Sequence, residues 1–433
     1  MTRTTRARSS SARRFPLAGV ESLEARALLN ARSVAHDAAS ALAPAPAAFV
    51  AEVAHRQRDH HHVHSHPGGP RAEINVVAAP LGNAPIAAAG TASAPAGPYT
   101  PTQIRHAYGF DRLSQTGAGQ TIAIVNAYDD PTIAADLGVF DQTYKLSAAN
   151  LVEAFSGGAK PAFNAAWAAE TALDVEWAHA IAPGAKILLV ETPTNSLYDL
   201  LAGVDYAVAH GANQVSMSWA APTFSVQTYF DPHFNHPGVS FLASAGDSAG
   251  AVSFPATSPY VTAVGGTTLQ LDAKGRRLSE TAWSSGGGGA TAFEHQAGYQ
   301  SVFATAPGRN VPDVSYNADF STGYSVYDTS SGGTWQDSGG TSAGAPQWAA
   351  LVALANQGRA ALGKAPLGTG TTFGLNQVLY PLAGVSMYFN FHGDYYTITS
   401  GSNGNDATFG YSMAAGLGSP AANQLVPDLV RAK

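Results

Sequence analysis

Four apolar stretches of strand length, separated by helical patterns, are the feature that most constrains how this chain can fold. The strand-like stretches are TIAIVNAY, KILLVET, NQVSMSWA and VSFLASAG. The helical patterns are TIAADLGVFDQTY, NAAWAAETALDVEWAHAIA and SLYDLLAGVDYAVAHG. Strands that are apolar throughout are buried on both faces, so this alternation predicts an α/β fold with a mostly parallel central sheet and helices on both faces. In such sheets, ligands bind beyond the carboxyl ends of the strands.

The first 96 residues differ in composition from the rest. They begin with an arginine-rich stretch and contain LEARALL, which resembles an N-terminal segment of some bacterial exported and surface proteins. Ala/Pro-rich and histidine-rich stretches follow, and these bury too little apolar surface to offset the entropy of ordering. We therefore predict an export-like segment and a disordered linker over residues 1–96, and one large folded domain over residues 97–433. The expected location is extracellular or on the cell surface.

Composition and charge exclude several classes of protein. The chain of 433 residues contains no cysteine, which rules out disulfides, thiolate zinc sites and a cysteine nucleophile. Residues 1–96 hold 10 of the 23 basic and 6 of the 30 acidic residues, which leaves residues 97–433 with a formal charge of −11. An acidic body repels phosphate backbones, so we expect no nucleic-acid partner. No apolar run reaches the roughly 20 residues of a membrane span, so we expect none.

Ser342 lies in Gly-Thr-Ser-Ala-Gly ahead of an apolar helical run, which is typical of a nucleophile at a sharp turn. The α/β-hydrolase fold shares this pattern but needs an acidic residue and then a histidine after the serine. Residues 343–391 contain no Asp or Glu, and the second match, at Ser248, is followed by Pro255 and Pro259 where a helix is needed. The sequence also contains no subtilisin-type histidine motif. We therefore expect a base other than histidine.

A helix predicted over residues 165–182 carries two carboxylates on one face. Asn164 is the expected N-cap, and Pro183 follows the end of the helix. At about 100° per residue, Glu170 and Asp174 lie about 40° apart around the helix. If they are buried side by side, they share a proton and titrate as a pair, which suits a general base for a serine in acid. The alternative is a pair of ordinary solvated carboxylates.

Asp247 follows the strand-like VSFLASAG and is expected at the carboxyl edge of the sheet. A protonated carboxyl at this edge can donate a hydrogen bond to a developing oxyanion, as amide side chains do in other enzymes. The alternative is a turn aspartate, for which Gly-Asp-Ser-Ala-Gly is a suitable sequence. With the pair on the helix, Asp247 and Ser342 indicate one acyl-transfer site that works in acid.

Six motifs in consecutive order resemble the sedolisin (serine-carboxyl peptidase) family, whose catalytic domain has a subtilisin-like α/β fold. They are YTPTQIRHAYGF, ETALDVEWAHAIAPGAK, SAGDSAG, VPDVSYNAD, GGTSAGAPQWAALVA and GLGSP, and the resemblance covers residues 97–433. It implies a catalytic domain that hydrolyses peptide bonds, with Ser342 as the nucleophile and Glu170 as the general base. It also implies that Asp174 orients Glu170 and that Asp247 completes the oxyanion hole. We expect a monomer that acts on peptide or protein substrates.

The chain departs from the family pattern in two places. The usual calcium site near the C-terminus needs carboxylate oxygens, but Thr397 and Ser412 stand where its Asp ligands are expected. Asp394 and Asp406 lie near enough in sequence to substitute, so calcium stays open as a cofactor. Residues 1–96 are also too short and too rich in Ala and Pro for the large folded prodomain of the family. These departures leave a second hypothesis open, a catalytically inactive homologue that acts as a surface binding protein.

Two segments are candidates for a substrate groove, because subtilisin-like folds hold an extended peptide through backbone groups of edge segments. They are Ser216–Trp219 and Ala243–Gly246, and the predicted substrate-binding residues within them are Ser216, Ser218, Trp219, Ala245 and Gly246. The alternative is that both segments are simply buried strand ends. Backbone recognition needs no particular side chains, so the sequence predicts no side-chain preference.

Overall fold

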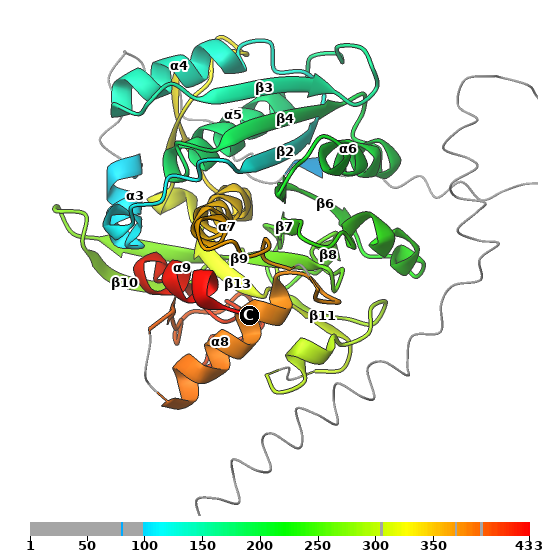
Figure 1. Ribbon diagram of the computed structural model, residues 1–433, viewed down its shortest axis with the longest axis vertical. Helices are drawn as coiled ribbons and strands as arrows, with labels where there is room; N and C mark the ends of the chain where they lie inside the picture. Colours follow the sequence, from blue (N-terminus) through cyan, green and yellow to red (C-terminus); the bar gives the residue numbers. More distant parts are fainter. Residues whose placement is uncertain (1–78, 81–97, 304–305, 369, 390–392) are drawn as a thin grey trace, which may run out of the picture. The chain divides into compact units, whose positions relative to one another are not determined.

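The computed structural model describes residues 79–80, 98–303, 306–368, 370–389 and 393–433 (Figure 1). Contacts divide the chain into two units, Met1–Ala72 and Glu73–Lys433, and all described residues belong to the second unit. The export-like segment and linker predicted over residues 1–96 therefore lie outside the described residues, apart from Ala79 and Pro80. Within the described part of the chain, no helix is long and apolar enough to cross a membrane.

The main sheet formed by the described residues has eight strands in the order β10-β9-β7-β5-β2-β4-β3, with β13 also paired to β9. The strands are β2 (Thr121–Ala127), β3 (Asn150–Phe155), β4 (Lys186–Thr192), β5 (Gln214–Met217), β7 (Ser240–Ser244), β9 (Val261–Leu271), β10 (Arg277–Ala282) and β13 (Val314–Asn317). All neighbours are parallel except β9 and β10. The prediction of a mostly parallel central sheet is confirmed.

Helices cover both faces of this sheet (Figure 1). On one face, α5 (Ala165–Ile181) contacts β2, and α7 (Gly344–Ala361) contacts β5, β7 and β9. On the other face, α6 (Leu197–Ala209) contacts β2 and β4. The outer helices are α3 (Pro101–Ala107), α4 (Ile133–Tyr144), α8 (Asn376–Phe389) and α9 (Ala422–Arg431).

Short strands and 3-10 helices make up the loops around this framework. The strands are β1 (Ala79–Pro80), β6 (Trp219–Pro222), β8 (Ser253–Phe254), β11 (Gly289–Thr291), β12 (Arg309–Val311), β14 (Tyr324–Tyr327), β15 (Trp335–Ser338), β16 (Tyr395–Tyr396) and β17 (Ser419–Pro420). The 3-10 helices are η1 (Phe110–Arg112), η2 (Gln227–Phe234), η3 (Gly298–Gln300), η4 (Phe320–Thr322) and η5 (Thr341–Ala343). Of these, β1, β6 and β8 form a separate three-stranded sheet.

Side chains that alternate along each central strand build two cores. In β2, Ile122 and Ile124 belong to the core that includes α5 and α7, whereas Ala123 and Val125 belong to the core that includes α6. All four are fully buried. Because both faces of the strand are covered, its sequence is apolar without alternation.

The helix that carries the predicted carboxylates has nearly the predicted bounds. Asn164 Oδ1 accepts hydrogen bonds from the backbone N–H groups of Ala166 and Trp167, at 3.1 and 3.3 Å. This cap satisfies donors that the first turn leaves unpaired. Ile181 is the last helical residue, and Pro183 follows it. The helix packs against both α4 and α7.

The stretch NQVSMSWA, predicted as one strand, is divided at Ser218. β5 ends at Met217 within the main sheet, whereas β6 begins at Trp219 in the separate three-stranded sheet. At the break, Ser218 Oγ donates to Asp174 Oδ1 at 2.7 Å and lies 3.3 Å from the carbonyl oxygen of Ser342. The chain therefore leaves the main sheet at the point where it meets two of the candidate catalytic residues.

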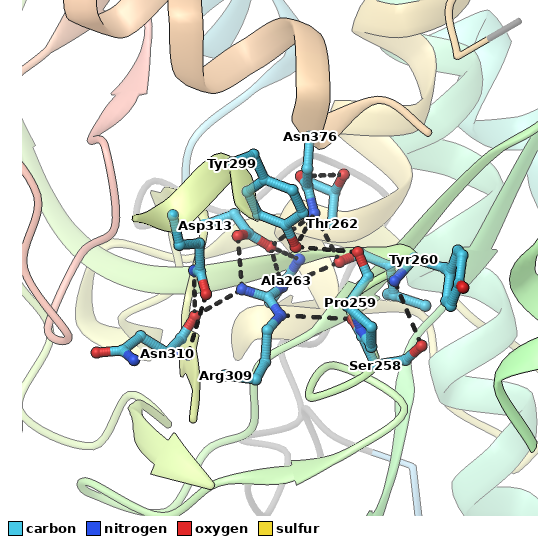
Figure 2. A network of polar contacts seen from close by, with 12 residues as sticks. Ser258, Pro259, Tyr260, Thr262, Ala263, Tyr299, Arg309, Asn310, Asp313 and Asn376 are labelled. Atoms are coloured by element: carbon cyan, nitrogen blue, oxygen red, sulfur yellow. Dashed lines mark hydrogen bonds and ion pairs between the residues drawn. The ribbon is translucent and has the colours of Figure 1, made fainter. Parts of the chain in front are cut away.

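A buried ion pair ties the C-terminal part of the chain to the sheet (Figure 2). Arg309 Nη1 and Nη2 donate to the two carboxylate oxygens of Asp313, at 2.8 and 2.5 Å, and neither side chain is exposed. Asp313 Oδ2 also accepts from the backbone N–H of Ala263 in β9 and from Asn376 Nδ2 at the start of α8. Because each charge has several partners, the pair is buried without an unsatisfied charge.

Arg309→Met should destabilise the fold strongly, because it leaves the Asp313 carboxylate buried without its counter-charge. We expect the free energy of unfolding to fall by about 3–5 kcal/mol. Arg276→Met is the matched control, since Arg276 also pairs with an Asp four residues away but is 66% exposed. It should lose less than about 1 kcal/mol. Urea unfolding measures both variants, and equal losses would contradict the role given to the buried pair.

Candidate active site

Ser342 lies on the 3-10 turn η5, directly before α7. The turn follows Gly340, whose φ of +86° lies in the left-handed region that glycine adopts without strain. A Cβ on Gly344 would lie 2.7 Å from Val264 Cγ1, so the first residue of α7 also has to be glycine for the turn to approach β9 this closely. In this position Ser342 is fully buried.

Glu170 and Asp174 are 1% and 0% exposed on α5, so the alternative of solvated carboxylates is wrong. Asp174 accepts hydrogen bonds from Ser218 Oγ at 2.7 Å and from Asn126 Nδ2 at 3.1 Å, one on each carboxylate oxygen. Neither oxygen of Glu170 has a partner of good hydrogen-bond geometry. The Ser342 hydroxyl nevertheless lies close enough to favour the ionised form of Glu170. The structure thus brings the carboxyl pair and the serine together.

Burial is the main cause of a raised pKa in both carboxyls. For Glu170, the charge of Asp174 raises the pKa further, well above its ordinary value, while the Ser342 hydroxyl lowers it. For Asp174, burial raises the pKa by more than the hydrogen bonds from Ser218 and Asn126 lower it. Two adjacent buried carboxyls cannot both ionise readily, so the pair keeps one proton over a range where exposed carboxylates have lost theirs.

Asp247 stands in the loop at the carboxyl end of β7, where Gly246 turns the chain with a φ of +113°. Its Oδ1 accepts hydrogen bonds from the backbone N–H and from the hydroxyl of Thr341, each at 2.8 Å. Its Oδ2 is buried and has no partner. Burial raises the pKa of Asp247, and the two bonds from Thr341 lower it. The charge of Asp247 also raises the pKa of Glu170, so all four predicted catalytic residues lie in one site.

Two residues that the sequence analysis did not single out complete this site. Asn126, near the carboxyl end of β2, donates to Asp174 and, at 3.2 Å, to Thr171 Oγ1. Thr341 holds Asp247 on the side next to the nucleophile. An amide in an otherwise apolar central strand was a usable signal for Asn126, since buried polar groups need partners. For Thr341 the sequence held no signal beyond its position beside the serine.

All five predicted substrate-binding residues are buried: Ser216, Ser218, Trp219, Ala245 and Gly246. The indole of Trp219 donates to the carbonyl oxygen of Val125, so this side chain points into the protein. The N–H of Gly246 donates to Thr341 Oγ1, and its carbonyl accepts from the N–H of Gly287 at 2.6 Å. That these residues bind substrate stays a prediction. Because their side chains are buried, such binding would use their main-chain groups.

The residues at the expected calcium position do not fit a calcium ion. Thr397 and Ser412 carry no charge, and Ser412 Oγ already accepts a hydrogen bond from a backbone N–H. Asp394 is buried next to Asp428, and its pKa is raised by burial and then by the charge of Asp428. Asp406 is exposed. In the part of the chain that the structure describes, no group of three His, Asp or Glu side chains is arranged to hold a metal. Calcium stays an untested prediction, and the mechanism below does not involve it.

Comparisons with known proteins find peptidases that are similar to this chain. The subtilase family model matches residues 163–372. Kumamolisin from Bacillus sp. (strain MN-32) is 35% identical over 381 residues, which cover 77% of this chain and 64% of kumamolisin. Sedolisin from Pseudomonas sp. (strain 101) is 36% identical over 141 residues, which cover 27% of this chain and 24% of sedolisin. Over most of its length the chain is therefore similar to members of the sedolisin family.

A solved structure of the sedolisin family has the same fold. Pseudomonas sedolisin, a serine-carboxyl proteinase complexed with two molecules of pseudo-iodotyrostatin, has a TM-score of 0.66 at 24% identity. The match covers 78% of this chain and 98% of that one, and it confirms the predicted subtilisin-like fold. The chain spans 64% of the length of kumamolisin and 24% of that of sedolisin.

Further carboxyls of this chain are buried, and burial raises the pKa of several of them. The pKa of Asp130 rises to about 7, those of Glu191 and Glu294 rise to about 8, and that of Glu176 rises well above its ordinary value. In an unfolded chain the same groups titrate near about 4. Between these values the folded chain binds more protons than the unfolded chain, so the free energy of unfolding falls as pH rises.

We therefore expect the protein to be most stable in acid, with a free energy of unfolding that falls between about pH 4 and pH 8. Each pKa unit of difference contributes about 1.4 kcal/mol. Glu191→Gln keeps an acceptor for the Asp130 N–H but removes one titration, so it should make the fall shallower. Asp406→Asn, at an exposed position, is the control and should leave the slope unchanged. Urea unfolding across this pH range tests the expectation, and a flat or rising curve would contradict it.

Proposed function

We propose that this protein is a serine-type peptidase that hydrolyses peptide bonds in acid through a Ser342 acyl-enzyme. The observation that carries the proposal is the meeting of Ser342 with two buried carboxyls, Glu170 and Asp174. A carboxyl base suits acidic conditions, in which a histidine would already be protonated. Relatives that include kumamolisin and sedolisin support the same class of reaction.

In the first half of the reaction, Ser342 Oγ attacks the carbonyl carbon of the scissile peptide bond. Its proton passes to Glu170, while Asp174 holds the shared proton and orients Glu170. Glu170 then protonates the leaving amine nitrogen, the C–N bond breaks, and an ester to Ser342 remains. In the second half, water gives its proton to Glu170 and attacks the ester carbonyl. The proton returns to Ser342 Oγ as the acid product leaves.

Asp247 is the oxyanion donor in this mechanism. Its Oδ1 already accepts two hydrogen bonds from Thr341, so the proton of the neutral carboxyl belongs on Oδ2. Because Oδ2 has no other partner, it can donate to the carbonyl oxygen as that oxygen gains negative charge. Ionisation of Asp247 would replace this donor with a negative charge beside the oxyanion.

The working pH range follows from two opposing requirements. The pair of Glu170 and Asp174 must have lost one proton, so that Glu170 can accept the proton of Ser342. Asp247 must keep its proton, which burial favours by raising its pKa. The pH profile of kcat should therefore be bell-shaped, with the alkaline limb set by loss of a proton from Asp247 or from the pair.

The proposal includes a peptide or protein substrate, a monomeric enzyme, and a location outside the cell or on its surface. The stretch LEARALL supports the location, because it resembles an N-terminal segment of some bacterial exported and surface proteins. The competing hypothesis is an inactive surface binding protein. It predicts a folded chain that hydrolyses no peptide at any pH.

Peptide hydrolysis between about pH 3 and pH 7 separates the two hypotheses. Ser342→Ala and Glu170→Gln should each lower kcat by several orders of magnitude, because they remove members of one catalytic unit. Asp247→Ala should lower kcat by about 10²–10³-fold, the loss expected for one oxyanion donor. Ser248→Ala changes the exposed serine of the second Gly-x-Ser-x-Gly match and should leave activity unchanged. Full activity without Ser342, or none in a folded wild type, would refute the peptidase.

Thr341→Val tests whether Thr341 acts through Asp247. The change removes the hydroxyl that favours the ionised form of Asp247, so the pKa of Asp247 should rise. We expect the alkaline limb of the kcat profile to move up by about one pH unit, the size of one hydrogen bond to a charged group. Thr341→Ser keeps both donors and should restore the wild-type profile. An unchanged limb in Thr341→Val would contradict the prediction that the charge of Asp247, held by Thr341, sets this limb.

A further inference from the structure

A run of four glycines, Gly286–Gly289, lies against the loop that carries Asp247. We call this run the glycine segment and Gly246–Ala251 the oxyanion loop. The N–H of Gly287 donates to the first carbonyl oxygen of the oxyanion loop at 2.6 Å, and the N–H of Gly288 donates to its last carbonyl oxygen at 2.8 Å. The glycine segment therefore holds both ends of the loop that bears the proposed oxyanion donor.

A second loop, Ser400–Met413, contacts the glycine segment, and we call it the C-terminal loop. Its Asn403 is 1% exposed, and Asn403 Nδ2 donates to the carbonyl oxygen of Gly286 at 2.9 Å. The same oxygen accepts the N–H of Gly250, in the oxyanion loop, at 3.2 Å. One carbonyl oxygen thus joins the buried amide of Asn403 to the oxyanion loop.

Two glycines of the segment leave no room for a side chain toward either loop. A Cβ on Gly287 would overlap the carbonyl oxygen of Ala245, the residue before the oxyanion loop. A Cβ on Gly288 would overlap the carbonyl oxygen of Met413 in the C-terminal loop. Because close-packed groups transmit strain, a displacement of the C-terminal loop should pass through the glycine segment to the oxyanion loop.

The side chain of Asn403 is itself fixed by its own loop. Its Oδ1 accepts hydrogen bonds from the N–H of Asn405 at 3.0 Å and from Asn405 Nδ2 at 3.2 Å. Asn405 Nδ2 also donates to the carbonyl oxygen of Gly288 at 3.3 Å. With its oxygen held in this way, Asn403 presents Nδ2 to Gly286 in one orientation, as a positioning contact requires.

We propose that Asn403 is a positioning residue for Asp247, which acts through Gly286 and the oxyanion loop. The inference rests on the peptidase function proposed above and adds a residue to its machinery. An oxyanion donor works only within a narrow range of distances to the developing charge. Thr341 fixes the carboxyl group of Asp247 through Oδ1, but the backbone of the oxyanion loop decides where the whole side chain stands.

Asn403→Ala tests the inference through the kinetics of peptide hydrolysis. We expect kcat to fall by about tenfold, because a small misplacement of a reacting group can cost up to about 100-fold. KM should stay nearly unchanged, since the oxyanion forms only in the transition state. Added to Asp247→Ala, the same change should lower kcat no further, because the side chain that it positions is gone. Equal factors in the two backgrounds would overturn the proposed route.

Asn356→Ala is the matched control for the loss of a buried amide. Asn356 lies in α7, is 2% exposed, and accepts the N–H of Leu367 at 2.9 Å, so it supports a different loop. Its change should lower the midpoint of urea unfolding but leave kcat of the folded protein unchanged. An equal loss of kcat in Asn356→Ala would reduce the effect of Asn403→Ala to general destabilisation and overturn the inference.

Asn405→Ala is a second variant, at a half-buried position, and it carries the test if Asn403→Ala does not fold. It removes the Nδ2 group that bonds both Asn403 Oδ1 and the carbonyl oxygen of Gly288. We expect kcat to fall by a smaller factor than in Asn403→Ala, and again not to fall further when Asp247→Ala is present. An unchanged kcat would count against the coupling.

Hydrogen exchange supplies a readout that does not depend on activity. The measurement uses chains that also carry Ser342→Ala, so that no self-cleavage interferes. Exchange over the oxyanion loop should become faster with Asn403→Ala, because the acceptor of the Gly250 N–H is no longer fixed, and stay unchanged with Asn356→Ala. Unchanged exchange with Asn403→Ala would overturn the coupling. Faster exchange together with no hydrolysis by any chain with an intact active site would uphold the coupling and count against the peptidase.

Discussion

The burial of two carboxyls against one serine is the constraint on which the rest of this structure depends. Away from water, Glu170 and Asp174 hold a proton where exposed carboxylates would be ionised, and this gives the serine a base suited to acid. The arrangement requires α5 and α7 to pack side by side, because one carries the pair and the other begins two residues after Ser342. Asn126 in β2 and Ser218 in the break after β5 then donate to Asp174 and fix its position.

The same chemistry extends through the whole fold. Asp130, Glu176, Glu191 and Glu294 are also buried with raised pKa values, so folding and the proposed catalysis respond to pH in the same direction. The pair of Arg309 and Asp313 is a different solution, in which a buried negative charge is matched by a guanidinium. That pair is needed where β9, β13 and α8 meet, and its stability does not depend on a retained proton.

The sheet, α5 and the four candidate catalytic residues could be predicted because their signals are local. Apolar strands covered on both faces have a recognisable composition, and the spacing of Glu170 and Asp174 fixes their common helix face. The division of NQVSMSWA could not be predicted, because it depends on contacts of Ser218 with residues 44 and 124 positions away. Thr341 and Asp247 are likewise 94 residues apart, so their bonds appear only in the folded chain. The pairing of Ala79 with β6 has no sequence signal either.

Ser218 links the buried carboxyl pair to the start of β6. It holds Asp174 through its hydroxyl, and the next residue, Trp219, begins β6. A strand that pairs with Trp219 therefore lies one residue from the donor that orients the base pair. A shift of β6 would therefore move the hydroxyl of Ser218, and with it the donor that orients Asp174.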